Sequence, residues 1–264
     1  MDPARIVPDD QVWLAIKSEC ARAAEREPLL AGFLYATVLS QPDIEESLSY
    51  LLASKLDNST LPALGVRDII LQVLNEDECI QRAILADLQA VVSRDPACPG
   101  YANPLLYFKG FQAIQAYRVA HHYWLNGRPQ LALYLQSRIS EVFAVDIHPG
   151  ATIGGNFFID HATGVVIGET TIIGENVRLY QAVTLGAKRF TQDESGALEK
   201  GVPRHPILED EVVVYAGATI LGRITIGRGS SIGGNVWLTR SVPPGSNVTQ
   251  ADVLNEVQSD GSGI

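Results

Sequence analysis

The chain has 264 residues, enough for one large domain or two of ordinary size, and 46% of them are hydrophobic. Its 30 acidic and 20 basic residues give a net charge of −10, which argues against nucleic acid as a partner. The apolar runs are too short to span a membrane, no secretory signal is readable and the three cysteines are widely spaced, so we expect a cytoplasmic protein without membrane contact or disulfides.

Residues 1–145 have the patterns of α-helices and predict an all-helical N-terminal domain. Ser40 followed by Asp43 resembles the capping box at the start of a helix. The clearest helix opens at Asn103-Pro104, with proline at the first helical position, and ends at Asn126-Gly127. Further helices are expected over about 9–26, 66–75, 77–93 and 129–144.

From residue 147 to residue 238, aliphatic side chains recur at every sixth position. One register contains Ile147, Ile153, Ile159 and Val165, a second Ile167, Ile173, Leu179 and Leu185, and a third Leu208, Val214, Ile220, Ile226, Ile232 and Leu238. This period fits neither an α-helix nor a flat strand. It is typical of a chain that turns a corner every six residues around a triangular prism. We therefore predict an α+β fold whose second domain, over 146–245, is a left-handed parallel β-helix.

The predicted helical half has a physical task whatever the function of the protein. The first coil of a β-helix would otherwise leave unpaired strand edges and an apolar cross-section open to water. We expect the N-terminal domain to cap that end of the β-helix and to contribute to oligomerisation.

Two breaks interrupt the six-residue spacing. The register slips by two residues between Val165 and Ile167, directly after His161. The spacing then disappears over 187–203, a charged segment that we expect to form an extruded loop. Past Pro243-Pro244-Gly245 the chain is polar, so 246–264 is predicted to be a flexible tail.

Polar residues that could carry chemistry lie close to these breaks. A neutral imidazole such as that of His161 suits proton transfer near neutral pH, and a carboxylate can fix its tautomer. Asp146 precedes His161 by 15 residues, which is close to one coil of 18, so stacking would bring the two together. A histidine that only forms hydrogen bonds within its turn fits the spacing equally well.

Arg204-His205 stands where the predicted loop re-enters the ladder. A guanidinium there is able to hold a carboxylate through two hydrogen bonds. A solvated arginine at a loop end is the alternative. His148, at the start of the first coil, fits a turn or capping residue better than a ligand.

Six segments together resemble the serine O-acetyltransferase family of the hexapeptide-repeat acyltransferase superfamily. They are SRDPAC (93–98), NPLLYFKGFQAIQAYRVAHH (103–122), VDIHPGATIG (145–154), DHATGVVIGET (160–170), TLGA (184–187) and RHP (204–206). The resemblance covers about residues 65–245. It implies transfer of an acetyl group from acetyl-CoA to the hydroxyl of L-serine, the first step of cysteine biosynthesis, without a metal.

The resemblance also implies roles for individual residues. His161 would be the general base and Asp146 would orient it. The ammonium of serine would meet Asp95 and Asp160, and its carboxylate would meet Arg204 and His205.

The acetyl-CoA site implied by the resemblance lies in a groove between adjacent subunits, near Gly186, Ala187, Ala216 and Gly217. Ser231 stands where a lysine near the coenzyme phosphate is common, and Arg228, or Arg223, is expected to replace it.

The resemblance implies a homotrimer, or a hexamer built from two trimers, with cysteine as a feedback inhibitor. The final Ile264 would enter the active site of O-acetylserine sulfhydrylase.

Two other functions fit parts of the pattern. A metal hydratase of the γ-carbonic-anhydrase type would need three histidines on zinc, and the second half offers His148, His161 and His205. A non-catalytic regulator of sulfhydrylase would need only the tail. A metal analysis and a thiol-release assay with serine separate these from the transferase.

Overall fold

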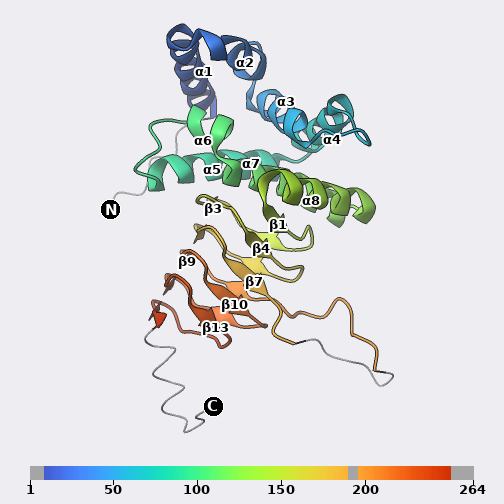
Figure 1. Ribbon diagram of the computed structural model, residues 1–264, viewed down its shortest axis with the longest axis vertical. Helices are drawn as coiled ribbons and strands as arrows, with labels where there is room; N and C mark the ends of the chain where they lie inside the picture. Colours follow the sequence, from blue (N-terminus) through green and yellow to red (C-terminus); the bar gives the residue numbers. More distant parts are fainter. Residues whose placement is uncertain (1–8, 190–195, 251–264) are drawn as a thin grey trace. The chain divides into compact units, whose positions relative to one another are not determined.

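The computed structural model describes residues 9–189 and 196–250 (Figure 1). Internal contacts divide the chain into two compact units between Gln112 and Ala113. This division falls inside a helix, whereas the change from helices to strands comes at Val145, next to the domain boundary expected after residue 145. The last helices before the strands therefore belong to the second unit.

The first unit is helical, as predicted. Its elements are α1 (Asp9–Arg26), η1 (Pro28–Leu30), α2 (Ala31–Leu34), the π-helix η2 (Tyr35–Leu39), α3 (Ile44–Leu56), α4 (Ala63–Glu76), α5 (Glu78–Arg94), α6 (Ala102–Tyr107) and the first turn of α7 (Lys109–Leu125). The helices expected over 9–26, 66–75 and 77–93 are confirmed. Helix α1 buries Val12, Ile16 and Cys20, which lie four residues apart and so share one face.

The helix expected to run unbroken from Asn103-Pro104 to Asn126-Gly127 is in fact two helices, α6 and α7. Phe108 between them is extended, with φ −87° and ψ 102°. Pro104 is the third residue of α6 rather than the first. The side-chain amide of Gln112 donates to the Leu105 carbonyl across 2.9 Å and so satisfies a backbone group that the break leaves open.

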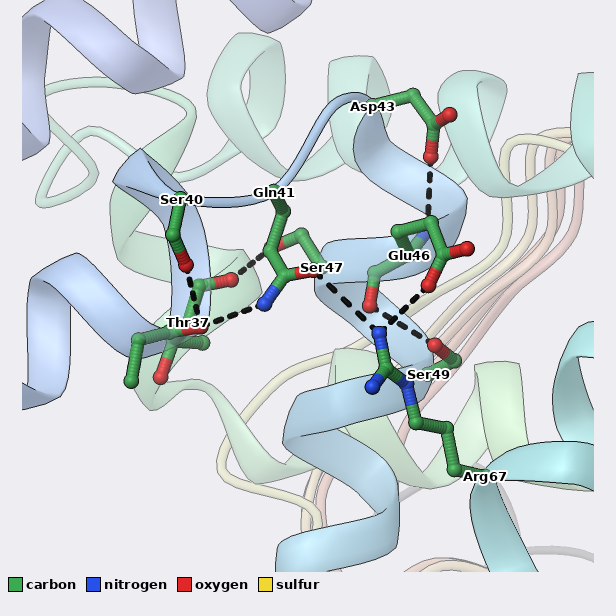
Figure 2. A network of polar contacts seen from close by, with 9 residues as sticks. Thr37, Ser40, Gln41, Asp43, Glu46, Ser47, Ser49 and Arg67 are labelled. Atoms are coloured by element: carbon green, nitrogen blue, oxygen red, sulfur yellow. Dashed lines mark hydrogen bonds and ion pairs between the residues drawn. The ribbon is translucent and has the colours of Figure 1, made fainter. Parts of the chain in front are cut away.

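The expected cap at Ser40 was also placed wrongly. Asp43 is the N-cap of α3, and its carboxylate accepts a hydrogen bond from the Glu46 amide at 2.8 Å (Figure 2). Ser40 instead ends the π-helix, where its hydroxyl lies 3.4 Å from the Ala36 carbonyl. An ion pair of 2.6 Å between Arg67 and Glu46 joins α4 to α3 beside this cap.

The second unit contains the rest of α7, helix α8 (Pro129–Phe143) and a parallel β-helix. Its strands are β1 (Val145–Ile147), β2 (Thr152–Ile153), β3 (Phe158–Ile159), β4 (Val165–Ile167), β5 (Ile172–Ile173), β6 (Arg178–Leu179), β7 (Thr184–Gly186), β8 (Ile207–Leu208), β9 (Val213–Val214), β10 (Thr219–Leu221), β11 (Thr225–Ile226), β12 (Ser231–Ile232), β13 (Trp237–Leu238) and β14 (Asn247–Val248). The predicted helix over 129–144 is confirmed as α8, and the predicted β-helix is confirmed by the parallel pairing of strands from successive coils.

Three parallel sheets form the faces of the prism, and Figure 1 shows strands of the first face stacked coil upon coil. The first face has the order β1-β4-β7-β10-β13, the second β2-β5-β8-β11 and the third β3-β6-β9-β12-β14. The aliphatic residues of the sequence registers point inward and are buried on all three faces. On the first face they form the column Ile147, Ile167, Leu185, Ile220 and Leu238.

Pairing shows where residues have been added to the regular coil. Ile167 pairs with Leu185 eighteen residues later, the length of a regular coil. Ile147 pairs with Ile167 after twenty residues, so the slip noted in the sequence adds two. Leu185 pairs with Ile220 after 35 residues, which is one coil together with the 17 residues of the loop expected over 187–203.

The part of helix α7 that belongs to the second unit closes the first coil of the β-helix. The Tyr117 hydroxyl donates to the Ala151 carbonyl, and the Arg118 guanidinium donates to the Gly154 carbonyl across 2.9 Å. His121 Nδ1 lies 2.6 Å from the Pro149 carbonyl oxygen. These contacts provide partners for carbonyl groups that no earlier coil is present to satisfy.

At the other end, the β-helix continues past residue 245, its expected limit. Strand β14 pairs with β12, so the last coil extends at least to Val248. The helices within the described part of the chain are all too short or too polar to cross a membrane.

Candidate active site

The edge of the prism between the third and first faces carries Asp160 and His161. We call it the base edge, and it includes residues 160–164, 180–183 and 215–218. The two extra residues of the first coil lie here. His161 and Ala162 have φ values of 58° and 64°, a left-handed conformation that is costly for residues other than glycine. This corner turns the His161 side chain outward, leaving it 70% exposed.

Asp160 lies beside His161 but is largely covered. Its side chain is 18% exposed, and its Oδ1 is 3.6 Å from His161 Nδ1. The other oxygen, Oδ2, accepts a hydrogen bond from Arg178 at 3.1 Å. The carboxylate therefore has one oxygen held by a cation and the other directed toward the imidazole.

Arg178, on β6, is a site residue that the sequence analysis did not identify. Its guanidinium lies over the rings of Phe158 and Tyr180, 4.9 Å and 4.7 Å from their centroids. Tyr180 in turn stacks on Tyr215 of the next coil at 5.3 Å. Phe158 and Arg178 are paired residues on successive coils, so their side chains are direct neighbours. A count of one coil along the sequence from Phe158 would have indicated this contact.

Asp146 lies on β1, and the chain just before β1 is hydrogen-bonded to the corner that carries His161. Gly164 donates to the carbonyl of Ala144, two residues before Asp146, at 2.8 Å. The pairing partner of Asp146 is Val166, and its Oδ1 accepts a hydrogen bond from Gln136 of α8 at 2.7 Å. Because the first coil has twenty residues rather than eighteen, Asp146 does not lie one regular coil below His161, and its role as the orienting carboxylate stays a prediction.

The edge between the first and second faces carries Arg204 and His205. We call it the arginine edge, and its described residues are 148–151, 168–171, 187–189, 196–206 and 222–224. Arg204 Nη2 forms an ion pair of 2.5 Å with Glu169. The hydroxyl of Thr170 accepts from the backbone amides of Arg204 and His205 at 2.9 and 3.1 Å. These contacts hold the end of the extruded loop on the coil below.

His205 is held in one orientation and one protonation state. Its Nδ1 accepts a hydrogen bond from the Thr170 amide at 3.1 Å, so the proton of the neutral ring is on Nε2. Burial and the neighbouring Arg204 guanidinium lower the pKa of His205 to about 4. A neutral imidazole with an Nε2–H group is a hydrogen-bond donor that suits a carboxylate.

Gly168 leaves room for this imidazole. A Cβ atom at residue 168 would lie 2.1 Å from Cδ2 of His205. His148 on the same edge accepts a hydrogen bond from the Gly150 amide at 3.0 Å, which confirms the turn role expected for it.

Glu169 and Thr170 were absent from the predicted site. They lie 35 residues before Arg204 and His205, the separation of Leu185 and Ile220 on the first face. Counting one coil and the extruded loop would have identified both as neighbours.

The residues expected to bind the coenzyme lie on different edges. Gly186 ends β7 and Ala187 begins the arginine edge, whereas Ala216 and Gly217 lie on the base edge. Arg228 lies on the third edge, between β11 and β12, where it forms ion pairs with Asp210 and Glu211 at 3.4 and 3.1 Å.

The remaining predicted residues lie elsewhere. Asp95 is in the helical unit, where it is the C-cap of α5 and accepts a hydrogen bond from the Ala97 amide at 2.8 Å. Ile264 lies outside the described residues. Among residues 9–189 and 196–250, no group of three histidine, cysteine or acidic side chains is arranged to hold a metal ion.

Comparison with known proteins identifies relatives along most of the chain. Residues 12–116 match the family model "Serine acetyltransferase, N-terminal". Serine acetyltransferase of Escherichia coli K12 is 43% identical over 233 residues, which is 88% of this chain and 82% of the relative. Serine acetyltransferase 4 of Arabidopsis thaliana is 46% identical over 239 residues, and the match spans 90% of this chain but 65% of that longer protein.

Solved structures share the same fold. The soybean serine acetyltransferase complexed with serine has a TM-score of 0.84 and 47% identity, covering 90% of this chain and 95% of its own. A serine acetyltransferase in complex with CoA has a TM-score of 0.84 and 42% identity, covering 91% and 96%.

Proposed function

This chain belongs to the serine acetyltransferase family, and we propose on that premise that it transfers the acetyl group of acetyl-CoA to L-serine. The products are O-acetyl-L-serine and CoA, and the reaction is the first step of cysteine biosynthesis. The observation that carries the proposal is the placement of two groups on two edges of the prism. The base edge presents the exposed imidazole of His161, and the arginine edge presents the neutral His205 beside Arg204.

In this mechanism His161 is the general base. The serine hydroxyl oxygen attacks the thioester carbonyl carbon while the imidazole takes the hydroxyl proton. Collapse of the tetrahedral adduct breaks the carbon–sulfur bond, and the proton returns to the sulfur of CoA. A positioned base contributes about 10²- to 10⁴-fold to such a step. Asp146 is proposed to orient the imidazole.

Recognition of serine is proposed to use opposite charges at its two ends. Asp95 and Asp160 meet the ammonium group, while Arg204 and His205 meet the carboxylate. The Nε2–H group of His205 donates to one carboxylate oxygen, and its low pKa keeps it neutral at physiological pH. Arg204 retains Glu169 as a partner, which fixes the direction of its guanidinium.

The site is proposed to form between two copies of the chain. His161 and Arg204 lie on different edges, with the three-residue strands of the first face between those edges. A strand of three residues spans on the order of 10 Å, more than the reach of one serine molecule. A homotrimer brings the base edge of one copy against the arginine edge of the next, and small residues at Gly186, Ala187, Ala216 and Gly217 leave room for the pantetheine arm.

Pairing of two trimers into a hexamer is proposed to use the helical unit. Its surface exposes large apolar side chains, with Leu29 98% and Leu14 63% accessible. Exposed apolar surface of this kind is typical of an association surface. Sedimentation of the purified protein gives the state directly.

Regulation is proposed at the same site and at the tail. Cysteine shares the ammonium and carboxylate of serine, so it would compete for Asp160, Arg204 and His205 as a feedback inhibitor. Ile264 would dock into the active site of O-acetylserine sulfhydrylase.

A thiol-release assay tests the proposed function. Acetyl-CoA and serine should give CoA in a stoichiometric ratio to O-acetylserine, with homoserine and threonine as comparison acceptors. Release of CoA at the same rate without serine would contradict acetyl transfer to an amino acid.

A further inference from the structure

Thr170 lies where the end of the extruded loop meets the preceding coil, and its hydroxyl is close to three polar groups. Oγ1 is 2.9 Å from the Arg204 amide nitrogen, 3.1 Å from the His205 amide nitrogen and 2.9 Å from Nδ1 of the His205 ring. An amide N–H group is always a donor, so Oγ1 accepts from both amides. A hydroxyl has two lone pairs and one proton, so only its proton is left for the ring.

These contacts fix which nitrogen of the His205 ring carries the proton. Nδ1 accepts from the Thr170 hydroxyl and also from the Thr170 amide at 3.1 Å. A proton on Nδ1 would point at two donors and would break both hydrogen bonds. The ring is therefore neutral with its proton on Nε2. Burial and the Arg204 guanidinium act in the same direction, because they lower the pKa of His205 to about 4.

The backbone of Thr170 contributes to the same arrangement. Its carbonyl and that of His205 both accept from Arg223 Nη1, at 2.6 and 3.1 Å. Thr171, the next residue, is a contrast: its side chain is buried, and its hydroxyl has no hydrogen-bond partner in the part of the chain that the structure describes. The hydroxyl of Thr170 thus makes contacts that the same group one residue later does not make.

We propose that Thr170 is a positioning residue of the acceptor site, which holds His205 as an Nε2–H donor and so favours acceptors that carry a carboxylate. The inference rests on the proposed function, in which His205 meets the carboxylate of serine. Thr170 does not touch the substrate and acts only through the ring. The other neutral form of the ring would present a lone pair on Nε2, which repels a carboxylate oxygen.

Three single substitutions test this role. Thr170→Val removes the hydroxyl and keeps the shape of the side chain, whereas Thr170→Ser keeps the hydroxyl. Thr171→Val is the matched control, because it removes a hydroxyl that has no partner among the described residues. Each variant is assayed with acetyl-CoA over a range of serine concentrations, and its melting temperature shows whether it folds.

We expect Thr170→Val to raise KM for serine about tenfold or more and to change kcat by less than about threefold, because the proposed base, His161, is untouched. Thr170→Ser and Thr171→Val should stay within about twofold of the unaltered protein. An unchanged KM in Thr170→Val, or an equal rise of KM in Thr170→Ser, would overturn the inference.

Nitrogen-15 NMR of protein labelled at histidine gives the proton position directly, because the two nitrogens of a neutral ring resonate differently. His205→Asn identifies the signals of His205 by their loss. We expect the Nε2–H form in the unaltered protein and in Thr171→Val, and a mixture of both forms in Thr170→Val. A rise of KM in Thr170→Val with the ring still wholly in the Nε2–H form would overturn the inference, since Thr170 would then only hold the end of the loop.

Failure of the proposed function looks different. Serine would then cause no release of CoA from acetyl-CoA by the unaltered protein, which would overturn the inference as well. Failure of the inference alone leaves turnover of serine by the unaltered protein in place.

Discussion

Arg178 donates a hydrogen bond of 3.1 Å to Asp160, and the guanidinium that does so lies over the rings of Phe158 and Tyr180. The aromatic contacts fix the arginine, and the arginine fixes the carboxylate next to His161. Since Asp160 is proposed to bind the ammonium of serine, Arg178 acts on the substrate only through that carboxylate.

Replacing Arg178 should therefore weaken serine binding. Hydrogen bonds to charged groups contribute about 1.5–3 kcal/mol, so we expect Arg178→Ala to raise KM for serine about tenfold or more with a smaller change in kcat. Arg178→Lys should restore part of the loss, because it keeps the charge near Asp160. A steady-state comparison checks this, with Arg82→Ala, an exposed helical arginine, as control; an unchanged KM in Arg178→Ala would contradict it.

His161→Ala should abolish most of the turnover and leave the fold intact. The side chain is 70% exposed, so its removal costs little packing. Loss of the base should lower kcat by at least about 10²-fold. Activity near that of the unaltered protein, with the melting temperature unchanged, would exclude this mechanism.

His205 should make the folded state sensitive to acid. Its pKa is lowered from 6.5 to about 4 by burial first and by Arg204 second, so the unfolded chain binds a proton more readily. Stability contributed by the neutral ring is therefore complete above pH 6.5 and falls as the pH decreases toward 4.

Melting temperatures measured from pH 7 to pH 4 check this. We expect His205→Asn to show a shallower decrease than the unaltered protein. His121 and His148, whose pKa values burial also lowers, remain in the variant and retain part of the slope. Identical slopes would show that His205 does not contribute.

Gly168→Ala should displace the His205 ring. The new Cβ would meet Cδ2 of His205 at 2.1 Å, too close for any heavy-atom contact. We expect KM for serine to rise about tenfold or more and the melting temperature to fall. Gly32→Ala is the matched control, because a Cβ at residue 32 would meet nothing within 4 Å. Equal behaviour of the two variants would mean that the fit of His205 is unimportant.

Deleting Ile264 should separate two activities. Acetyl transfer should persist, because none of the proposed catalytic or serine-binding residues lies in the tail. Affinity for O-acetylserine sulfhydrylase should decrease, and calorimetry with the two purified proteins measures it. An affinity equal to that of the full chain would remove Ile264 as the docking residue.

Local patterns in the sequence were sufficient for much of the fold. The helix over Asp9–Arg26 follows from its apolar spacing and the loop over 187–203 from the lost six-residue period. The break at Phe108 and the cap at Asp43 were missed, because competing signals at Pro104 and Ser40 were as strong locally. Hydrogen bonds formed in the folded chain, such as those from the Glu46 amide to Asp43 and from Gln112 to the Leu105 carbonyl, decide where each helix begins and ends.

The sequence by itself determined the prism, because a six-residue aliphatic period can bury its side chains only around a three-sided core. It also supplied His161, Arg204 and His205 as candidates through their places at breaks in that period. Only the tertiary structure decided what these residues touch. Glu169 and Thr170 are distant in the chain from Arg204 and His205, as Arg178 is from Asp160. They become neighbours only when coils of different lengths stack in register.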